Sequence, residues 1–137
     1  NPSIHSLLSS KYHEAQMYRL NIHAEIPDPV THNYLTDLDL AVVLGHLMDN
    51  AIDGARKASE GFISLAYFDE EDCQSFIIES TIADEQVPLS MMSTQTPHPE
   101  GGIGVNAVQD ILERYPNTSF SVRSQNHKMM QILEMRP

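Results

Sequence analysis

The chain has 137 residues, with nineteen acidic side chains against eight basic ones and a formal net charge of −11. So few cations argue against nucleic acid or an anionic membrane as the main partner, and no apolar stretch has the length of a membrane span. A single cysteine, Cys73, excludes an internal disulfide, and seven scattered histidines lack the paired spacing of a zinc site. The length is that of one domain over residues 1–137, and because the chain starts at Asn1 without Met, we expect a fragment of a longer protein.

The apolar pattern predicts that the chain begins with a helix, a strand and a second helix. We expect an amphipathic helix from Ile4 to Leu20 and then a short strand from Asn21 to Ile26. The second helix carries a long apolar stripe, with Asp37 as its N-cap and Gly61 beyond its far end.

The rest of the chain predicts two hairpins separated by a loop and a helix. The acidic turn Asp69-Glu70-Glu71-Asp72 joins the first pair of strands, and Asn126-His127 forms the tip of the second pair. A long surface loop covers residues 82–100. In chain order we expect strands over Phe62–Phe68 and Ser75–Glu79, a helix over Val105–Tyr115, and strands over Ser119–Ser124 and Lys128–Met135.

The most informative segment is Leu40–Ala55, which places apolar residues at helical spacing and gathers Asp49, Asn50 and Asp53 among them. Asp and Asn inside a helix compete for backbone hydrogen bonds, so another demand holds them there. A hard cation bound by side-chain oxygens is one such demand. From these residues alone, a solvated helix face or a local cap is the alternative.

A glycine-rich segment, Gly101–Val108, opens the predicted helix that ends at Tyr115. Glycines let the backbone come close to a ligand, and the N–H groups of a first helical turn form an anion site. The alternative is a plain turn before a helix. The order of the two motifs is more informative than either motif alone.

The order of elements and the two motifs resemble the ATP-binding fold of the gyrase, chaperone, histidine-kinase and mismatch-repair ATPase superfamily. Asp49-Asn50-Ala51 resembles its N box, and Gly102-Ile103-Gly104-Val105 resembles its second glycine box. The segment Leu44–Asp53 is most similar to sensor histidine kinases, especially the peptide-pheromone group used in quorum sensing. The resemblance implies an α+β fold: a two-layer α/β sandwich whose mixed sheet is covered on one face by helices, with a long ATP-lid loop.

The resemblance also implies an activity, in which Mg-ATP is bound and its γ-phosphate is transferred to a histidine on a separate dimerisation domain. Asn50 would coordinate Mg²⁺, with Asp49 and Asp53 as polar neighbours around it. Arg56 and Lys57 are the nearest basic candidates for countering phosphate charge, or else solvated residues at a helix end. The phosphates would meet the backbone of the glycine box, namely Gly102, Ile103, Gly104 and Val105.

Two positions depart from the family pattern. The family uses an Asp-x-Gly-x-Gly box to hydrogen-bond adenine, whereas this chain has Ile78–Asp84 without glycine. Ser80 and Thr81 become the candidate adenine contacts, with Asp84 as an alternative. His46 stands one helical turn before Asn50, where related proteins have Asn or a catalytic Glu. It is a candidate catalytic residue beside Asn50, as a phosphate contact or general base, with a structural histidine as the alternative.

Two functions therefore stay open. Retention of both motifs favours an enzyme, the ATP-binding catalytic domain of a two-component sensor histidine kinase with ATP and Mg²⁺ as cofactors. The altered adenine box, and the lack of any Lys or Arg between Lys57 and Arg114, favour a degenerate nucleotide-binding fold that serves as a signalling scaffold. For the kinase we expect a dimerisation and phosphoacceptor domain and a response regulator as partners, no nucleic acid, a monomeric isolated domain, and a cytoplasmic location as part of a membrane-bound sensor.

Overall fold

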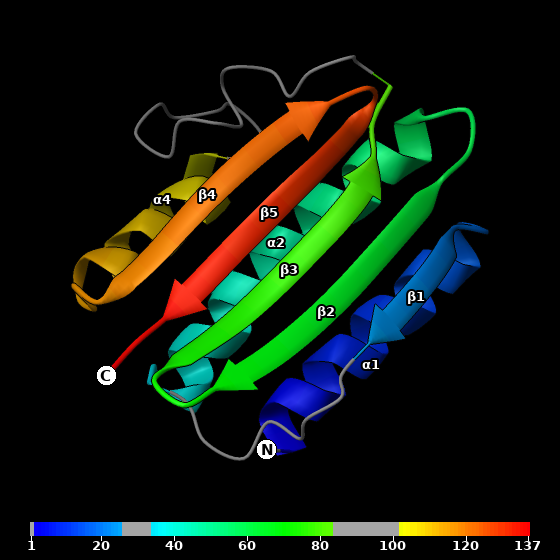
Figure 1. Cartoon of the computed structure of the whole chain (residues 1–137). Helices are drawn as coiled ribbons and strands as arrows, with labels where there is room; N and C mark the ends of the chain where they lie inside the picture. The colour runs from blue at the N-terminus through cyan, green and yellow to red at the C-terminus, as the bar shows by residue number, and fades with distance from the viewer. Residues whose placement is uncertain (1, 26–33, 84–101) are drawn as a thin grey trace.

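A computed structural model describes residues 2–25, 34–83 and 102–137. Its five strands form one sheet in the order β1-β2-β3-β5-β4, and the helices α1, α2 and α4 lie together behind one face of it (Figure 1). β1 pairs with β2 in parallel, and the other pairs are antiparallel. This confirms the predicted two-layer α+β sandwich with a mixed sheet. The elements are α1 (Pro2–Met17), β1 (Asn21–Glu25), α2 (Asp37–Lys57), β2 (Phe62–Glu70), β3 (Cys73–Thr81), α4 (Gly102–Glu113), β4 (Thr118–Gln125) and β5 (Lys128–Met135).

The core lies between α2 and the covered face of the sheet. Side chains of β3 alternate between the two faces, and every second one, from Gln74 to Ser80, is buried beneath the helices. The facing stripe of α2 recurs every three or four residues and includes Leu40, Val43, Leu44, Leu47, Met48, Ala51, Ile52 and Ala55, all buried. Because this stripe faces the sheet, the polar residues of α2 must lie on its flanks.

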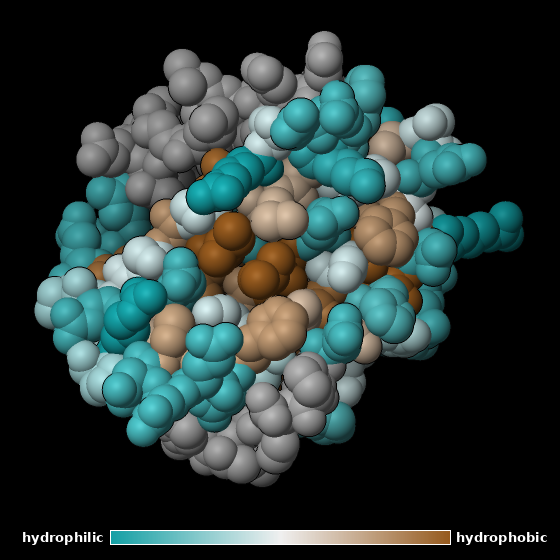
Figure 2. Space-filling model, viewed as in Figure 1, coloured by the Kyte–Doolittle hydropathy of each residue, from teal (hydrophilic) through white to brown (hydrophobic). Residues whose placement is uncertain are grey.

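The other face of the sheet is open and carries a small apolar centre. Ala66, Ile77 and Ile132 lie side by side in the register of β2, β3 and β5, and each is half-buried. Phe68 lies farther along β2 and is 38% exposed. Figure 2 shows apolar side chains gathered at the middle of this face within a mostly hydrophilic rim. The helices therefore form a layer on one side only.

Two helix ends differ from the sequence prediction. α1 ends at Met17 instead of Leu20, because Arg19 adopts a left-handed conformation with φ of 60°. The N–H of Arg19 then bonds to the carbonyl of Gln16, and the N–H of Leu20 bonds to that of Ala15, a Schellman motif without its usual glycine. A non-glycine residue at this position gave the sequence no stop signal.

The N-cap of α2 is Thr36, and the prediction of Asp37 was wrong by one residue. The Thr36 hydroxyl accepts a hydrogen bond from the Asp39 N–H at 3.2 Å, while Asp37 lies in the first turn with its charge at the positive end of the helix dipole. α4 likewise begins at Gly102, three residues before the predicted Val105. Both helices thus start earlier than their apolar pattern indicated.

Both predicted hairpins are confirmed. β2 and β3 extend into the acidic segment and leave only residues 71–72 as the turn. β5 has the predicted bounds, and the β4–β5 turn places Asn126 and His127 at φ of 54° and 61°, as a two-residue hairpin turn requires. The predicted ATP lid over residues 82–100 falls almost wholly outside the described residues.

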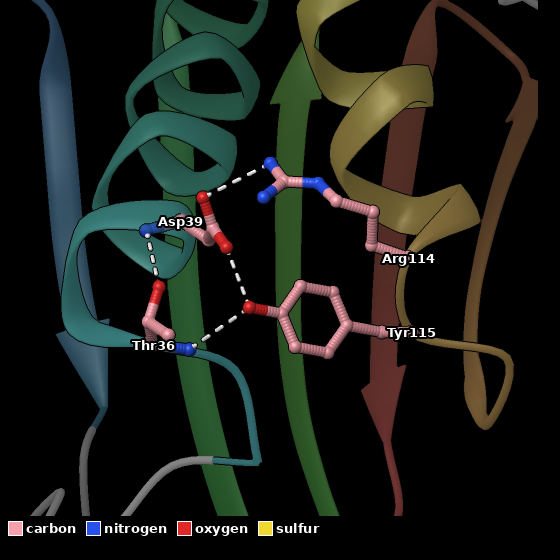
Figure 3. Close-up of polar contacts among 4 residues, drawn as sticks. All are labelled: Thr36, Asp39, Arg114 and Tyr115. Carbon is pink, nitrogen blue, oxygen red and sulfur yellow. Dashed lines mark hydrogen bonds and ion pairs between the residues drawn. The ribbon is translucent and has the colours of Figure 1, made fainter.

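A polar cluster of Thr36, Asp39, Arg114 and Tyr115, called here the Asp39 cluster, joins the start of α2 to the segment that follows α4 (Figure 3). The Tyr115 hydroxyl donates to Asp39 at 2.5 Å and accepts from the Thr36 N–H at 3.3 Å. Arg114 donates to the other Asp39 oxygen at 3.2 Å. Asp39 is largely buried, so its carboxylate depends on these donors for solvation.

The Tyr115 hydroxyl, with help from Thr36 and Arg114, holds the pKa of Asp39 below its ordinary value of 3.8. A carboxyl whose pKa is lowered in the folded state contributes stability above its unfolded pKa, and this contribution is lost as pH falls through the folded pKa. We predict that Asp39→Asn lowers the free energy of unfolding by about 1–2 kcal/mol at neutral pH. The gap between wild type and variant should close as the pH falls below about 3 to 4.

Urea denaturation at neutral and acid pH measures this gap. Asp110→Asn, which removes a carboxylate from an exposed position of α4, is the matched control and should show little change at either pH. A gap for Asp39→Asn that stays the same at both pH values would contradict a role for the charged carboxylate.

Candidate functional site

The polar residues of α2 lie on two separate sides of the helix. Asp49 and Arg56 face α1 and the turn after it. Lys11 of α1 binds Asp49 with 2.6 Å between Nζ and Oδ1, and the Arg56 guanidinium stacks on the Tyr18 ring at 3.9 Å from its centroid. The other side carries residues at spacings of four, three and four: His46, Asn50, Asp53 and Lys57.

The ion pair of Lys11 with Asp49 joins α1 to α2. Burial works to lower the pKa of Lys11, yet the hydrogen bond and charge of Asp49, with Glu14 nearby, raise it above its ordinary value. Asp49 and Arg56 therefore serve the contact between α1 and α2. The predicted phosphate contact Arg56 is placed away from Asn50 and on Tyr18, whereas Lys57 remains exposed on the side of Asn50.

The side chain of Asn50 is oriented by a buried glutamine of β5. Gln131 donates from Nε2 to the Leu47 carbonyl at 2.9 Å. This bond sets the orientation of the Gln131 amide. Its Oε1 then accepts from Asn50 Nδ2 at 3.4 Å. With its nitrogen used in this way, Asn50 keeps its carbonyl oxygen Oδ1 for another partner, and an amide oxygen is a suitable ligand for a hard cation.

The end of β3 lies beneath α2, next to Asn50. Ser80 is fully buried, and its hydroxyl has no hydrogen-bond partner among the described residues. The neighbouring turn of α2 has Gly54, where an added Cβ would lie 2.9 Å from Ile82 Cγ2, 3.3 Å from the Thr81 carbonyl oxygen and 3.9 Å from Ser80 Oγ. The absent side chain is what allows α2 to pack this close to the strand end.

The two predicted adenine contacts point to opposite faces of the sheet. Thr81 donates from its hydroxyl to the Glu60 carbonyl at 2.9 Å and accepts from the Phe62 N–H at 3.0 Å, so its side chain is used in holding the start of β2. Ser80, one residue earlier, faces α2. The structure therefore brings Ser80, and not Thr81, to the side of Asn50.

The glycine box opens α4, whose first turn comprises Gly102, Ile103, Gly104 and Val105. α4 begins at the end of the sheet where β3 and β4 finish, and it runs antiparallel to α2 (Figure 1). This first turn has no acidic residue, and its backbone N–H groups, which have no partner within the helix, lie at the positive end of the helix dipole. This turn is suited to an anion.

The remaining predicted site residues are accessible. His46 is half-buried one turn before Asn50, and Asp53 is exposed one turn after it. Within the described part of the chain, no group of three or more His, Cys, Asp or Glu residues could hold a metal ion. The Asn50 carbonyl oxygen could serve as a protein ligand for a hard cation. Over residues 2–25, 34–83 and 102–137, no helix is long and apolar enough to cross a membrane.

Two residues of the site were missed in the sequence interpretation. Gln131 is a polar residue at an inward position of an apolar strand, between the buried Met129 and Leu133. Gly54 interrupts the interior of a helix, where glycine is unfavourable. Both are local anomalies, and either could have been found by asking what holds it there.

Comparison with known proteins gives the same fold. The chain matches the GHKL domain family over residues 35–136, and no curated protein matches it. It superposes on the nucleotide-free catalytic domain of histidine kinase ThkA with a TM-score of 0.78 and 14% identity, over 99% of this chain and 90% of that one. For histidine kinase AdeS of Acinetobacter baumannii the TM-score is 0.71 at 14% identity, over 98% of this chain and 63% of that chain. For full-length ShkA in complex with AMPPNP it is 0.74 at 12% identity, over 98% and 29%.

The close approach at Gly54 gives a prediction with an internal control. Gly54→Ala places a methyl group against Ile82 and the Thr81 carbonyl, so despite better helix propensity we expect a net destabilisation of about 1–2 kcal/mol. Gly45→Ala makes the same change where the new Cβ would meet only Leu7 Cδ1 at 3.7 Å, and should stabilise by up to about 1 kcal/mol. Chemical denaturation of both variants measures the difference. Equal stabilisation by the two would show that α2 does not press on the end of β3.

Proposed function

Because the chain belongs to the GHKL domain family, we propose that it is the Mg-ATP-binding catalytic domain of a sensor histidine kinase. It would supply the γ-phosphate for autophosphorylation of a histidine on a separate dimerisation domain. The observation that carries this proposal is the position of Asn50, on the open flank of α2 with its amide held by Gln131. The bond to Gln131 leaves the Asn50 amide oxygen for a hard cation.

In this proposal Asn50 Oδ1 is the protein ligand for Mg²⁺, which neutralises charge on the phosphates when bound. Asp53, one turn further along α2, would hold water molecules around the cation. The backbone N–H groups of the first turn of α4, from Gly102 to Val105, would receive phosphate oxygens. Lys57 is the basic side chain on the same flank, whereas Arg56 stays with Tyr18.

The adenine would lie against the end of β3. A buried hydroxyl without a partner is costly, so the Ser80 Oγ is a natural contact for a polar edge of a bound base. Ser80 lies beside Gly54, where α2 packs closely against the strand end. His46 completes the flank as a phosphate contact or general base, with a structural histidine as the alternative.

A second function is favoured by one specific observation. Ser80 replaces the acidic residue that the family uses for adenine, and the segment around it lacks glycine. A weakened adenine contact would suit a domain that keeps the fold as a signalling scaffold and binds nucleotide poorly.

For the kinase we further propose a response regulator as partner, a quorum-sensing role and a cytoplasmic location in a membrane-bound sensor.

Calorimetric titration with a non-hydrolysable ATP analogue tests the kinase proposal. We predict saturable binding that requires magnesium and falls at least about 10-fold in Asn50→Ala, because the variant removes the ligand oxygen. The adjacent Asp49→Asn is the matched control, since Asp49 points to Lys11 and should not affect affinity. Circular dichroism checks that both variants fold.

Two outcomes would contradict this proposal. Wild type that gives no heat at millimolar nucleotide would support the scaffold. Unchanged binding in Asn50→Ala would show that the cation does not bind at Asn50 of α2.

Ser80→Ala gives an independent prediction, because loss of affinity and gain of stability should occur together. Removing a buried hydroxyl that lacks a partner should leave the free energy of unfolding unchanged or raise it by up to about 1 kcal/mol. The same variant should weaken ATP binding several-fold. Thermal unfolding and calorimetry measure the two effects. A destabilised variant with normal affinity would show that the hydroxyl serves the fold and not the ligand.

A further inference from the structure

α2 and α4 pack side by side and antiparallel, and the Asp39 cluster joins them at one end. At this end, the first turn of α2 meets the residues that follow α4 (Figure 3). At the other end lie the later turns of α2 with Asn50 and the first turn of α4. The cluster is thus far from the proposed phosphate site along both helices.

The two helices have matched lengths measured from this joint. Asn50 is eleven residues after Asp39 on α2, and Gly104 is eleven residues before Tyr115 on α4. Arg114 and Tyr115 follow α4, which ends at Glu113, and their N–H groups bond to the Ile111 and Leu112 carbonyls three residues back, as in a 3₁₀ turn. At about 1.5 Å per residue in the helices and about 2 Å over the last two residues, both arms are roughly 16 to 18 Å long. Fixing the joint therefore brings Gly104 level with Asn50.

The other contacts between α2 and α4 define the position of α4 along the axis of α2 less well. Where its side chains are described, α4 packs through apolar residues such as Val108 and Ile111. Apolar burial is non-directional, whereas hydrogen bonds depend steeply on distance and angle. The Tyr115 hydroxyl makes two of them, to the Asp39 carboxylate and to the Thr36 N–H of the N-cap. The Arg114 side chain is 60% exposed, and its ion pair with Asp39 holds less firmly.

We propose that Tyr115 and Asp39 are positioning residues, which set the axial position of α4 against α2 and so place the first turn of α4 level with Asn50 for the phosphates of a bound nucleotide. This role rests on the proposed function. It assigns the cluster a purpose beyond stability, because a slide of α4 by even one residue would move the N–H groups about 1.5 Å from the phosphates.

The test compares a ligand with phosphates and one without. Tyr115→Phe removes only the hydroxyl. We expect its affinity for the magnesium complex of a non-hydrolysable ATP analogue to fall roughly 5- to 10-fold by calorimetry. Its affinity for adenosine, followed by NMR titration, should not change, since adenosine does not reach α4. Asp39→Asn should give a similar loss, and the double variant should lose no more than either single one.

Amide hydrogen exchange gives a second readout that needs no nucleotide. In Tyr115→Phe, exchange should rise over α4 while the sheet and α1 stay protected. Tyr12→Phe, which removes a hydroxyl from an exposed tyrosine of α1, is the matched control for both measurements and should resemble wild type.

Three results would overturn the positioning role. Equal losses for adenosine and the ATP analogue would mark the cluster as merely structural. Normal affinity for the analogue together with raised exchange in α4 would show that the axial position does not govern phosphate binding. Unchanged exchange in α4 would show that the cluster does not hold this helix. If wild type binds neither ligand, the proposed function fails, yet exchange raised only in α4 would still support the joint between the helices.

Discussion

The apolar stripe of α2 on the sheet is the constraint on which the rest of the structure depends. From Leu40 to Ala55 this stripe is buried against β3 and its neighbours, which fixes the rotation of the helix about its own axis. Each polar residue of α2 then has only one direction available. Asp49 must face α1, and Asn50 must face the flank above β5. The position of the site is thus a consequence of core packing.

Three further contacts turn this rotation into a defined geometry. Gly54 lets the helix approach the end of β3, Gln131 orients the amide of Asn50, and the Asp39 cluster fixes one end of α4. Each joins α2 to a different element, so the candidate site draws on α2, β3, β5 and α4 together. The open face of the sheet takes no part in it, which separates binding from whatever that face contacts (Figure 2).

The sequence predicted the fold well, because its signals are local. Apolar periodicity located each helix and strand, and Asn126-His127 identified a hairpin turn that the structure confirms. Helix ends were less predictable, since Arg19 occupies a left-handed position without being glycine. Within the site, the face of Ser80 depends on strand register, and the stacking of Arg56 on Tyr18 depends on how α1 packs. Such long-range contacts leave no spacing pattern in the chain.

Four of the five strands form two hairpins that meet along the pairing of β3 with β5, and this seam has a consequence for folding. Each hairpin closes around a two-residue turn, whereas the seam joins Ser80 to Met129 and Gln74 to Met135, partners about fifty to sixty positions apart. Pairing of such distant strands carries a larger loop-closure entropy and comes later than local pairing. Ser80 and Gln131 lie on opposite sides of the seam. A ligand that contacts both residues can therefore bind only after the two hairpins have paired. Its binding would then stabilise the paired, folded state.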